Sequence, residues 1–194
     1  PAIGHNTTGC GTPAPMPSNL GAKPMILGLF GRKSPPVGEA LYRAIVAQAR
    51  HPALYVDHRV PDSVEGRFEM IVLHLVLVFN RLKTGSRDDV AMGQGALDLF
   101  FTEVDHQMRQ MGVGDLSVPK KMKKVGEAWT GRSRVYDEVI GAGDQKAIAE
   151  ALARNVPGEV AAQNLAAYVL VARSTLAATP TATVANGVIT WPDP

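Results

Sequence analysis

The chain has 194 residues, a length that suits one domain with short tails. Its residues are 45% hydrophobic and 20% charged, which is enough apolar material for a core and too little charge for disorder throughout. The formal net charge of +2 does not mark a nucleic-acid binder, and the single cysteine, Cys10, excludes an internal disulfide and a cysteine metal cluster. The longest apolar run, Met70 to Phe79, is shorter than the ~18 residues of a membrane span.

The N-terminal part carries no periodic pattern. Residues 1–24 are rich in Gly, Pro, Thr and Asn, which predicts a disordered tail or a sequence added in cloning. Residues 25–38 form an N-terminal arm, and its apolar stretch from Met25 ends in two cations. We favour an arm packed on the domain over a peripheral membrane foothold.

The first two helices are predicted from apolar spacing and from breakers. One spans 39–50 and ends at His51, because a residue before proline disfavours helix. The next begins at Asp62, taken as an acidic cap, and runs to about Lys83. From Met70 to Phe79 it is apolar on nearly every face, so we expect it to lie at the centre of the domain.

Four more helices follow. They are expected at 86–111, 118–140, 144–155 and from Gly158 to about Ala177. Gly112 suits a left-handed cap and Ser117 a helix start, whereas Gly126 and Gly131 indicate a kink or a close helix approach.

The fold class is therefore all-α. We predict a single compact domain of about six helices over 39–178, with irregular N- and C-terminal tails, the second covering 179–194. In that tail Asn186-Gly187 is compatible with a small hairpin, and an extended tail anchored by Trp191 is an equal alternative.

The most distinctive charge feature is a cationic segment. Between 120 and 134 a single acid, Glu127, faces six cations: Lys120, Lys121, Lys123, Lys124, Arg132 and Arg134. Three interpretations remain open, namely a solvated helix face, a docking surface for an acidic partner or an anionic membrane, and a contact with RNA. The preceding loop, Gly112, Val113, Gly114 and Asp115, faintly resembles a phosphate loop, but helix capping accounts for it better.

The residues indicate no reaction chemistry. The five histidines form no i,i+4 pair, so neither a metal site nor a cofactor is expected. For an enzyme, the candidates would be Asp98, Asp105 and His106. We instead expect a structural polar network in the fold, with His74 as a hydrogen-bonded core histidine. Its members would be Arg67, His74, Asp98, Asp105 and Arg109.

Several strings, in order, resemble the ubiquinol–cytochrome c chaperone family. They include Tyr42–Arg50, Val60–Glu69, Leu73-His74, Phe100-Phe101, Asp105, Met108-Arg109, Met111–Asp115, Val118–Lys124 and Gly131-Arg132 with Tyr136. The resemblance covers about 40–175 and looks like an alphaproteobacterial member rather than a mitochondrial one.

The resemblance implies an assembly chaperone for the cytochrome bc complex (respiratory complex III) that binds cytochrome b and has neither enzyme activity nor a cofactor. It further implies a bacterial cytoplasmic protein, peripheral at the inner face of the membrane, with a small partner subunit or the ribosome exit region as candidate partners and no role for DNA. The candidate client-binding residues are the loop 112–115 and the six cations, beside which an apolar groove is expected. The alternative function is a ribosome- or RNA-associated factor acting through the basic helix.

Overall fold

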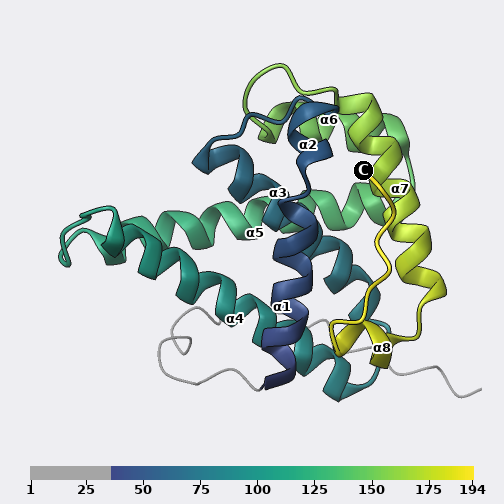
Figure 1. The fold of residues 1–194 in the computed structure, drawn as a ribbon, viewed down its shortest axis with the longest axis horizontal. Helices are drawn as coiled ribbons and strands as arrows, with labels where there is room; N and C mark the ends of the chain where they lie inside the picture. The colour runs from purple at the N-terminus through teal and green to yellow at the C-terminus, as the bar shows by residue number, and fades with distance from the viewer. Residues whose placement is uncertain (1–35) are drawn as a thin grey trace, which may run out of the picture.

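The structure, a computed structural model, describes residues 36–194 and builds that part of the chain from helices (Figure 1). The expected segment 1–24 and most of the arm 25–38 lie outside the described residues. Six long helices and two of five residues follow one another: α1 (Pro36–Ala49), α2 (Pro52–Val56), α3 (Val64–Leu82), α4 (Arg87–Gln110), α5 (Val118–Ala142), α6 (Gln145–Asn155), α7 (Ala162–Ala178) and α8 (Thr181–Ala185). The prediction of an all-α fold with about six helices is confirmed.

Helix α3 lies at the centre, as its sequence indicated. It packs against α1, α4, α5, α7 and α8, and every residue from Glu69 to Val78 is buried. Its cap is Ser63, whose hydroxyl accepts a hydrogen bond from the Gly66 amide at 3.1 Å. The expected cap Asp62 is instead paired with Arg67 on the surface.

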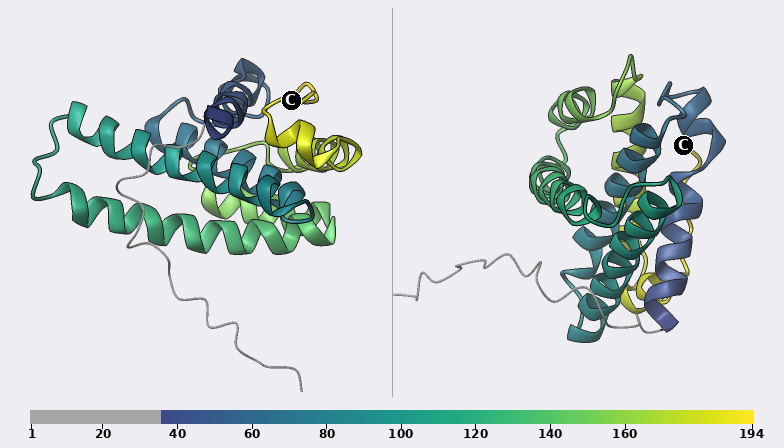
Figure 2. Two further views of the ribbon diagram at one scale, coloured as in Figure 1. Left: turned by 90° about the horizontal axis from the view of Figure 1, so that it is seen from below. Right: turned by 90° about the vertical axis from the view of Figure 1, so that its left-hand side faces the viewer.

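Helices α4 and α5 form a long antiparallel hairpin whose outer half projects beyond the other helices (Figures 1 and 2). A capping box starts α4, because Ser86 and Asp89 exchange side-chain and backbone hydrogen bonds. Gly112, at φ +80°, ends α4 in the left-handed conformation expected of it. Ser117 makes no side-chain cap, contrary to expectation, so α5 starts without one.

Two glycine contacts set how closely helices approach. A Cβ on Gly38 would lie 3.2 Å from the backbone of Gly95, so α1 crosses α4 at short range. Gly187 has a φ of +76°, and a Cβ added to it would lie only 2.7 Å from the backbone of Ala40. The close approach suggested for Gly131 is wrong, since a Cβ there would meet nothing within 4 Å.

The C-terminal segment, expected to be irregular, contains α8 and then an extended stretch. The hairpin interpretation is wrong because Asn186 caps α8 instead of forming a strand turn. The anchoring part of the alternative is confirmed, although Thr181–Ala185 is helical rather than extended: the Trp191 ring packs edge-on against His74 at 5.3 Å between centroids. Gln48 of α1 also donates a hydrogen bond to the Pro192 carbonyl at 3.1 Å. The end of the chain thus covers the buried face of α1 and α3.

Candidate functional site

The four lysines of the cationic segment lie on the first turns of α5, beside the loop that joins it to α4. All four are exposed: Lys120, Lys121, Lys123 and Lys124. Lys123 lies 3.9 Å from Glu127, an ion pair between two side chains that are both more than half exposed. Such a pair contributes little to stability, so most of this positive charge faces solvent.

The loop before α5 is a closed turn. The Ser117 amide donates to the Gly114 carbonyl at 2.8 Å, and the Val113 amide donates to the Met108 carbonyl at 3.1 Å. Asp115 contacts Arg109 at 2.5 Å. The Val113 and Ser117 amides are thus used within the turn, which supports capping over phosphate binding.

Arg132 does not belong to the exposed cationic face. Its Nε lies 2.6 Å from a carboxylate oxygen of Glu69, whose side chain is only 3% exposed. Burial raises the pKa of Glu69, and the hydrogen bond and charge of Arg132 oppose that rise. The guanidinium also lies 5.9 Å from the Phe68 ring centre. Arg132 therefore holds α5 to α3, and the cationic face reduces to the lysines and Arg134.

An apolar groove lies beside that face, between α3, α4 and α5. Its volume is about 430 Å³. Apolar side chains from all three helices line it: Val76, Phe79, Leu97 and Trp129. Phe79 and Trp129 stack edge to face, with 5.9 Å between ring centroids. The expected apolar groove is present, although sequence reasoning did not identify the residues that line it.

Polar groups surround the groove. Arg134 and Ser133 of α5 line it, together with Lys83, which pairs with Asp137 at 2.6 Å. The groove therefore combines an apolar floor with a charged edge formed by Arg134, Lys83 and Asp137. In the sequence, the four-residue spacing from Trp129 to Ser133 could have indicated that these two side chains lie on one face of a helix.

His74 is the core histidine predicted from the sequence. Its Nδ1 pairs with the Met70 carbonyl and its Nε2 with the Tyr168 hydroxyl, both at 2.7 Å. Gln48 donates to that hydroxyl at 3.0 Å, so Tyr168 can donate to Nε2 while Nδ1–H donates to the carbonyl. Burial lowers the pKa of His74 to about 4, and the imidazole is neutral at pH 7.

The wider polar network predicted around His74 is wrong. Arg67 is exposed and pairs at 2.6 Å with Asp62, which lies on the surface just before the cap of α3. Asp105 pairs with Arg109 at 2.7 Å, the i,i+4 contact that the sequence indicated. Asp98 accepts a hydrogen bond from Gln94. These residues form separate local pairs.

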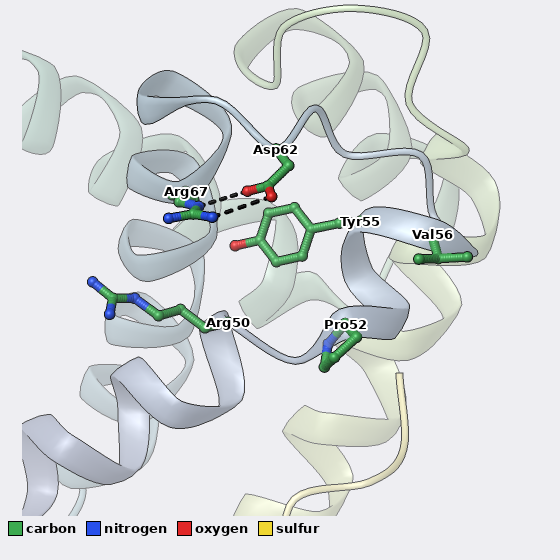
Figure 3. A pocket seen from close by; sticks show the side chains of 6 residues that line it. All are labelled: Arg50, Pro52, Tyr55, Val56, Asp62 and Arg67. Carbon is green, nitrogen blue, oxygen red and sulfur yellow. Dashed lines mark hydrogen bonds and ion pairs between the residues drawn. The ribbon is translucent and has the colours of Figure 1, made fainter.

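A second cavity, of about 300 Å³, opens where α2 meets the start of α3 (Figure 3). Arg50 and Arg67 both line it, beside the Tyr55 ring. The Tyr55 hydroxyl is already used, since it donates to the Ala49 carbonyl at 2.7 Å. Arg67 is likewise paired with Asp62, so most of the polar groups here already have partners.

The candidates for catalysis are not brought together. Asp98 and Asp105 have the partners named above, and His106 contacts Gln110 at 2.8 Å. None of the three lines either cavity. Among the described residues no group of three or more acidic, His or Cys side chains is placed to hold a metal ion. Of the helices in 36–194, none has the length and apolar character of a membrane span.

Comparison with known proteins agrees with the resemblance seen in the sequence. The model of the ubiquinol–cytochrome C chaperone family matches residues 56–191. The chain belongs to this family. It is also similar to the crystal structure of the Cbp3 homolog from Brucella abortus, at 38% identity and a TM-score of 0.73, over 81% of this chain and 89% of that one. No curated protein matches. The groove and the cationic face of this family member both lie inside the matched region.

Proposed function

We propose that the chain is an assembly chaperone for the cytochrome bc complex and binds cytochrome b during its synthesis or maturation. Membership of the ubiquinol–cytochrome c chaperone family supports this role. The observation that carries it is the groove between α3, α4 and α5, because an apolar floor beside a charged edge suits a segment of a membrane-protein client.

The groove suits temporary binding. At about 430 Å³ it can take a few apolar side chains of the client. Burying one such side chain contributes about 1.5–3 kcal/mol, and association itself opposes binding by several kcal/mol. Affinity therefore stays low enough for release, while Arg134 and the α5 lysines offer long-range attraction to anionic groups.

The place of action follows from the client. A chaperone for a membrane subunit works where that subunit enters the bilayer, so we propose the bacterial cytoplasm, at the inner face of the membrane. The family resemblance adds the ribosome exit region and a small partner subunit as candidate partners. The client contact would include the groove and the candidate surface, namely the loop 112–115, the four α5 lysines and Arg134.

The test is deletion of the gene in its native host, followed by measurement of cytochrome bc complex levels and purification of the tagged chain to recover cytochrome b. We expect loss of the complex and recovery of cytochrome b with the wild type. Normal complex levels without the gene would contradict the proposal.

A matched pair of variants locates the contact. Ser133→Glu places a carboxylate at the groove, whereas Ser174→Glu does the same on an exposed turn of α7; both serines now bond only backbone carbonyls. We expect about 10-fold less cytochrome b with the first variant, since the cost of a poorly paired charge exceeds 1.4 kcal/mol. Equal recovery of cytochrome b with both variants would show that the groove does not bind it.

The exposed lysines support a second candidate, a ribosome- or RNA-associated factor. If α5 neutralises three or four phosphates, the logarithm of the binding constant falls against the logarithm of salt with a slope of roughly −3. Filter binding of ribosomal RNA over a salt series measures this slope. Absence of binding at low salt would exclude the candidate.

A further inference from the structure

The end of the α4–α5 hairpin carries an exposed apolar apex that neither the groove nor the core uses. We call residues 111–124 the hairpin tip. Leu116 is 98% exposed and Met111 is 62% exposed. Their neighbours Val118 and Met122, a few residues away, are 1% and 7% exposed. The tip can therefore bury apolar side chains, yet it holds Leu116 outside.

Positive charge flanks this apex. From Arg109 to Lys124 the chain carries five cations and a single acid, Asp115. That acid is already paired with Arg109. No ion pair forms at Lys120, Lys121 or Lys124 among the described residues. The tip thus presents unneutralised lysines directly beside exposed apolar side chains.

The shape of the tip restricts the partner. It projects beyond the other helices (Figure 2), and neither cavity is lined by any of its residues. A peptide segment is held in a groove, and single-stranded RNA stacks on aromatic rings. From 111 to 124 the sequence contains no aromatic residue. A protruding apolar apex with lysines beside it suits entry into a lipid headgroup layer.

We infer that the hairpin tip docks on a membrane rich in anionic lipids, with Met111 and Leu116 entering the headgroup layer and the α5 lysines contacting the phosphates. The inference rests on the proposed function, to which it adds the element that meets the bilayer. Thirteen residues of helix and turn separate Leu116 from Trp129, so the groove lies within about 20 Å of the lipid contact. A client segment leaving or entering the bilayer there is within reach of the groove.

The test is flotation of the full chain with vesicles of phosphatidylcholine and phosphatidylglycerol at three to one, against phosphatidylcholine alone. Binding to the anionic vesicles is expected, with little to the neutral ones. The triple variant Lys120→Gln, Lys121→Gln, Lys124→Gln should lower the partition coefficient about 100-fold, because each surface cation contributes about a fivefold factor. Leu116→Ser should lower it about 10-fold.

Two variants with equal changes elsewhere serve as controls. One is the triple variant Arg87→Gln, Lys146→Gln, Arg154→Gln, which removes three other exposed cations. The other is Val171→Ser, at an apolar residue that is 54% exposed on α7. Both should keep wild-type binding, and circular dichroism confirms that every variant is folded.

Several results would overturn the inference. One is equal binding of the chain to neutral and anionic vesicles. Another is wild-type vesicle binding by both tip variants. The third is a chain that binds ribosomal RNA through the tip but binds no vesicles. The proposed function is tested separately by cytochrome b recovery. If the chain binds anionic vesicles through the tip but recovers no cytochrome b, the inference is supported and the proposed function is contradicted. If a groove variant loses cytochrome b and keeps vesicle binding, both are supported.

Discussion

The helical body around α3 and the hairpin tip differ in how far their side chains are buried and paired. In the body, His74 is buried with both ring nitrogens paired. At the tip, Leu116 is almost fully exposed, and among the described residues no ion pair forms at Lys120, Lys121 or Lys124. Residues in the body therefore determine stability, whereas those at the tip are available for contacts with other molecules. Substitutions should separate the two regions clearly.

The largest effect is expected at the ion pair between α3 and α5. Arg132→Ala leaves Glu69 buried without its partner, and removal of one member of a buried pair costs about 3–5 kcal/mol. Urea unfolding at pH 7 measures this loss. Arg134→Ala, an exposed neighbour on the same helix, should change the free energy of unfolding by less than ~0.5 kcal/mol.

The pH dependence of that loss checks its cause. Burial already raises the pKa of Glu69, and without Arg132 it rises further. In the folded variant Glu69 then binds a proton more tightly than in the unfolded chain. The free energy of unfolding of the variant therefore increases as the pH falls below the pKa of Glu69 in the folded state, and decreases as the pH rises through that pKa. The deficit should shrink between pH 7 and pH 5. A constant deficit would mean that Arg132 acts through packing alone.

The second prediction concerns His74 and acid stability. Burial lowers its pKa from 6.5 to about 4, so between these values the folded chain binds fewer protons than the unfolded one. The free energy of unfolding therefore falls as the pH decreases from about 6.5 to about 4, by about 3 kcal/mol from this residue. Above pH 6.5 this contribution is fully present. Urea unfolding at pH 7 and pH 4.5 measures the difference.

Two substitutions separate His74 from the other histidines. His74→Gln should remove the part of the pH dependence that comes from His74, even though the variant is less stable at pH 7. The part from the buried His58, whose pKa burial also lowers, should remain. His106→Gln changes an exposed residue on α4 and should leave the pH dependence as in the wild type. If both variants titrate like the wild type, His74 does not control acid stability.

Local sequence features explain why most of the fold was predictable. Ser86 and Asp89 are three residues apart, as a capping box requires, and Gly112 stands where a left-handed cap ends a helix. The apolar run in α3 required burial on all sides. Errors arose where a local pattern had two outcomes: Asn186-Gly187 ends a helix because α8 packs on α1, α3 and α4.

The site was less predictable because its contacts are distant in sequence. Glu69 and Arg132 are 63 residues apart, and their partnership removes Arg132 from the cationic face. The groove requires Phe79, Leu97 and Trp129 from three helices whose packing angles no spacing rule specifies. The exposed lysines were identified correctly as exposed cations because consecutive cations on a helix cannot all be buried. Which molecule these lysines contact remains a proposal, from the sequence and from the structure alike.

The smallest effect on stability is expected at the tip. Reversal of charge at Lys120, Lys121, Lys123 and Lys124 to Glu touches only exposed side chains and one weak pair with Glu127. Each change should alter the free energy of unfolding by less than ~0.5 kcal/mol, in contrast to Arg132→Ala. The same variant should lose anionic vesicles and recover less cytochrome b, because like charges now face the phosphates. A folded variant with unchanged recovery and vesicle binding would show that these lysines are only a solvated surface. A large loss of stability would instead place the tip within the folded core and erase its distinction from the body.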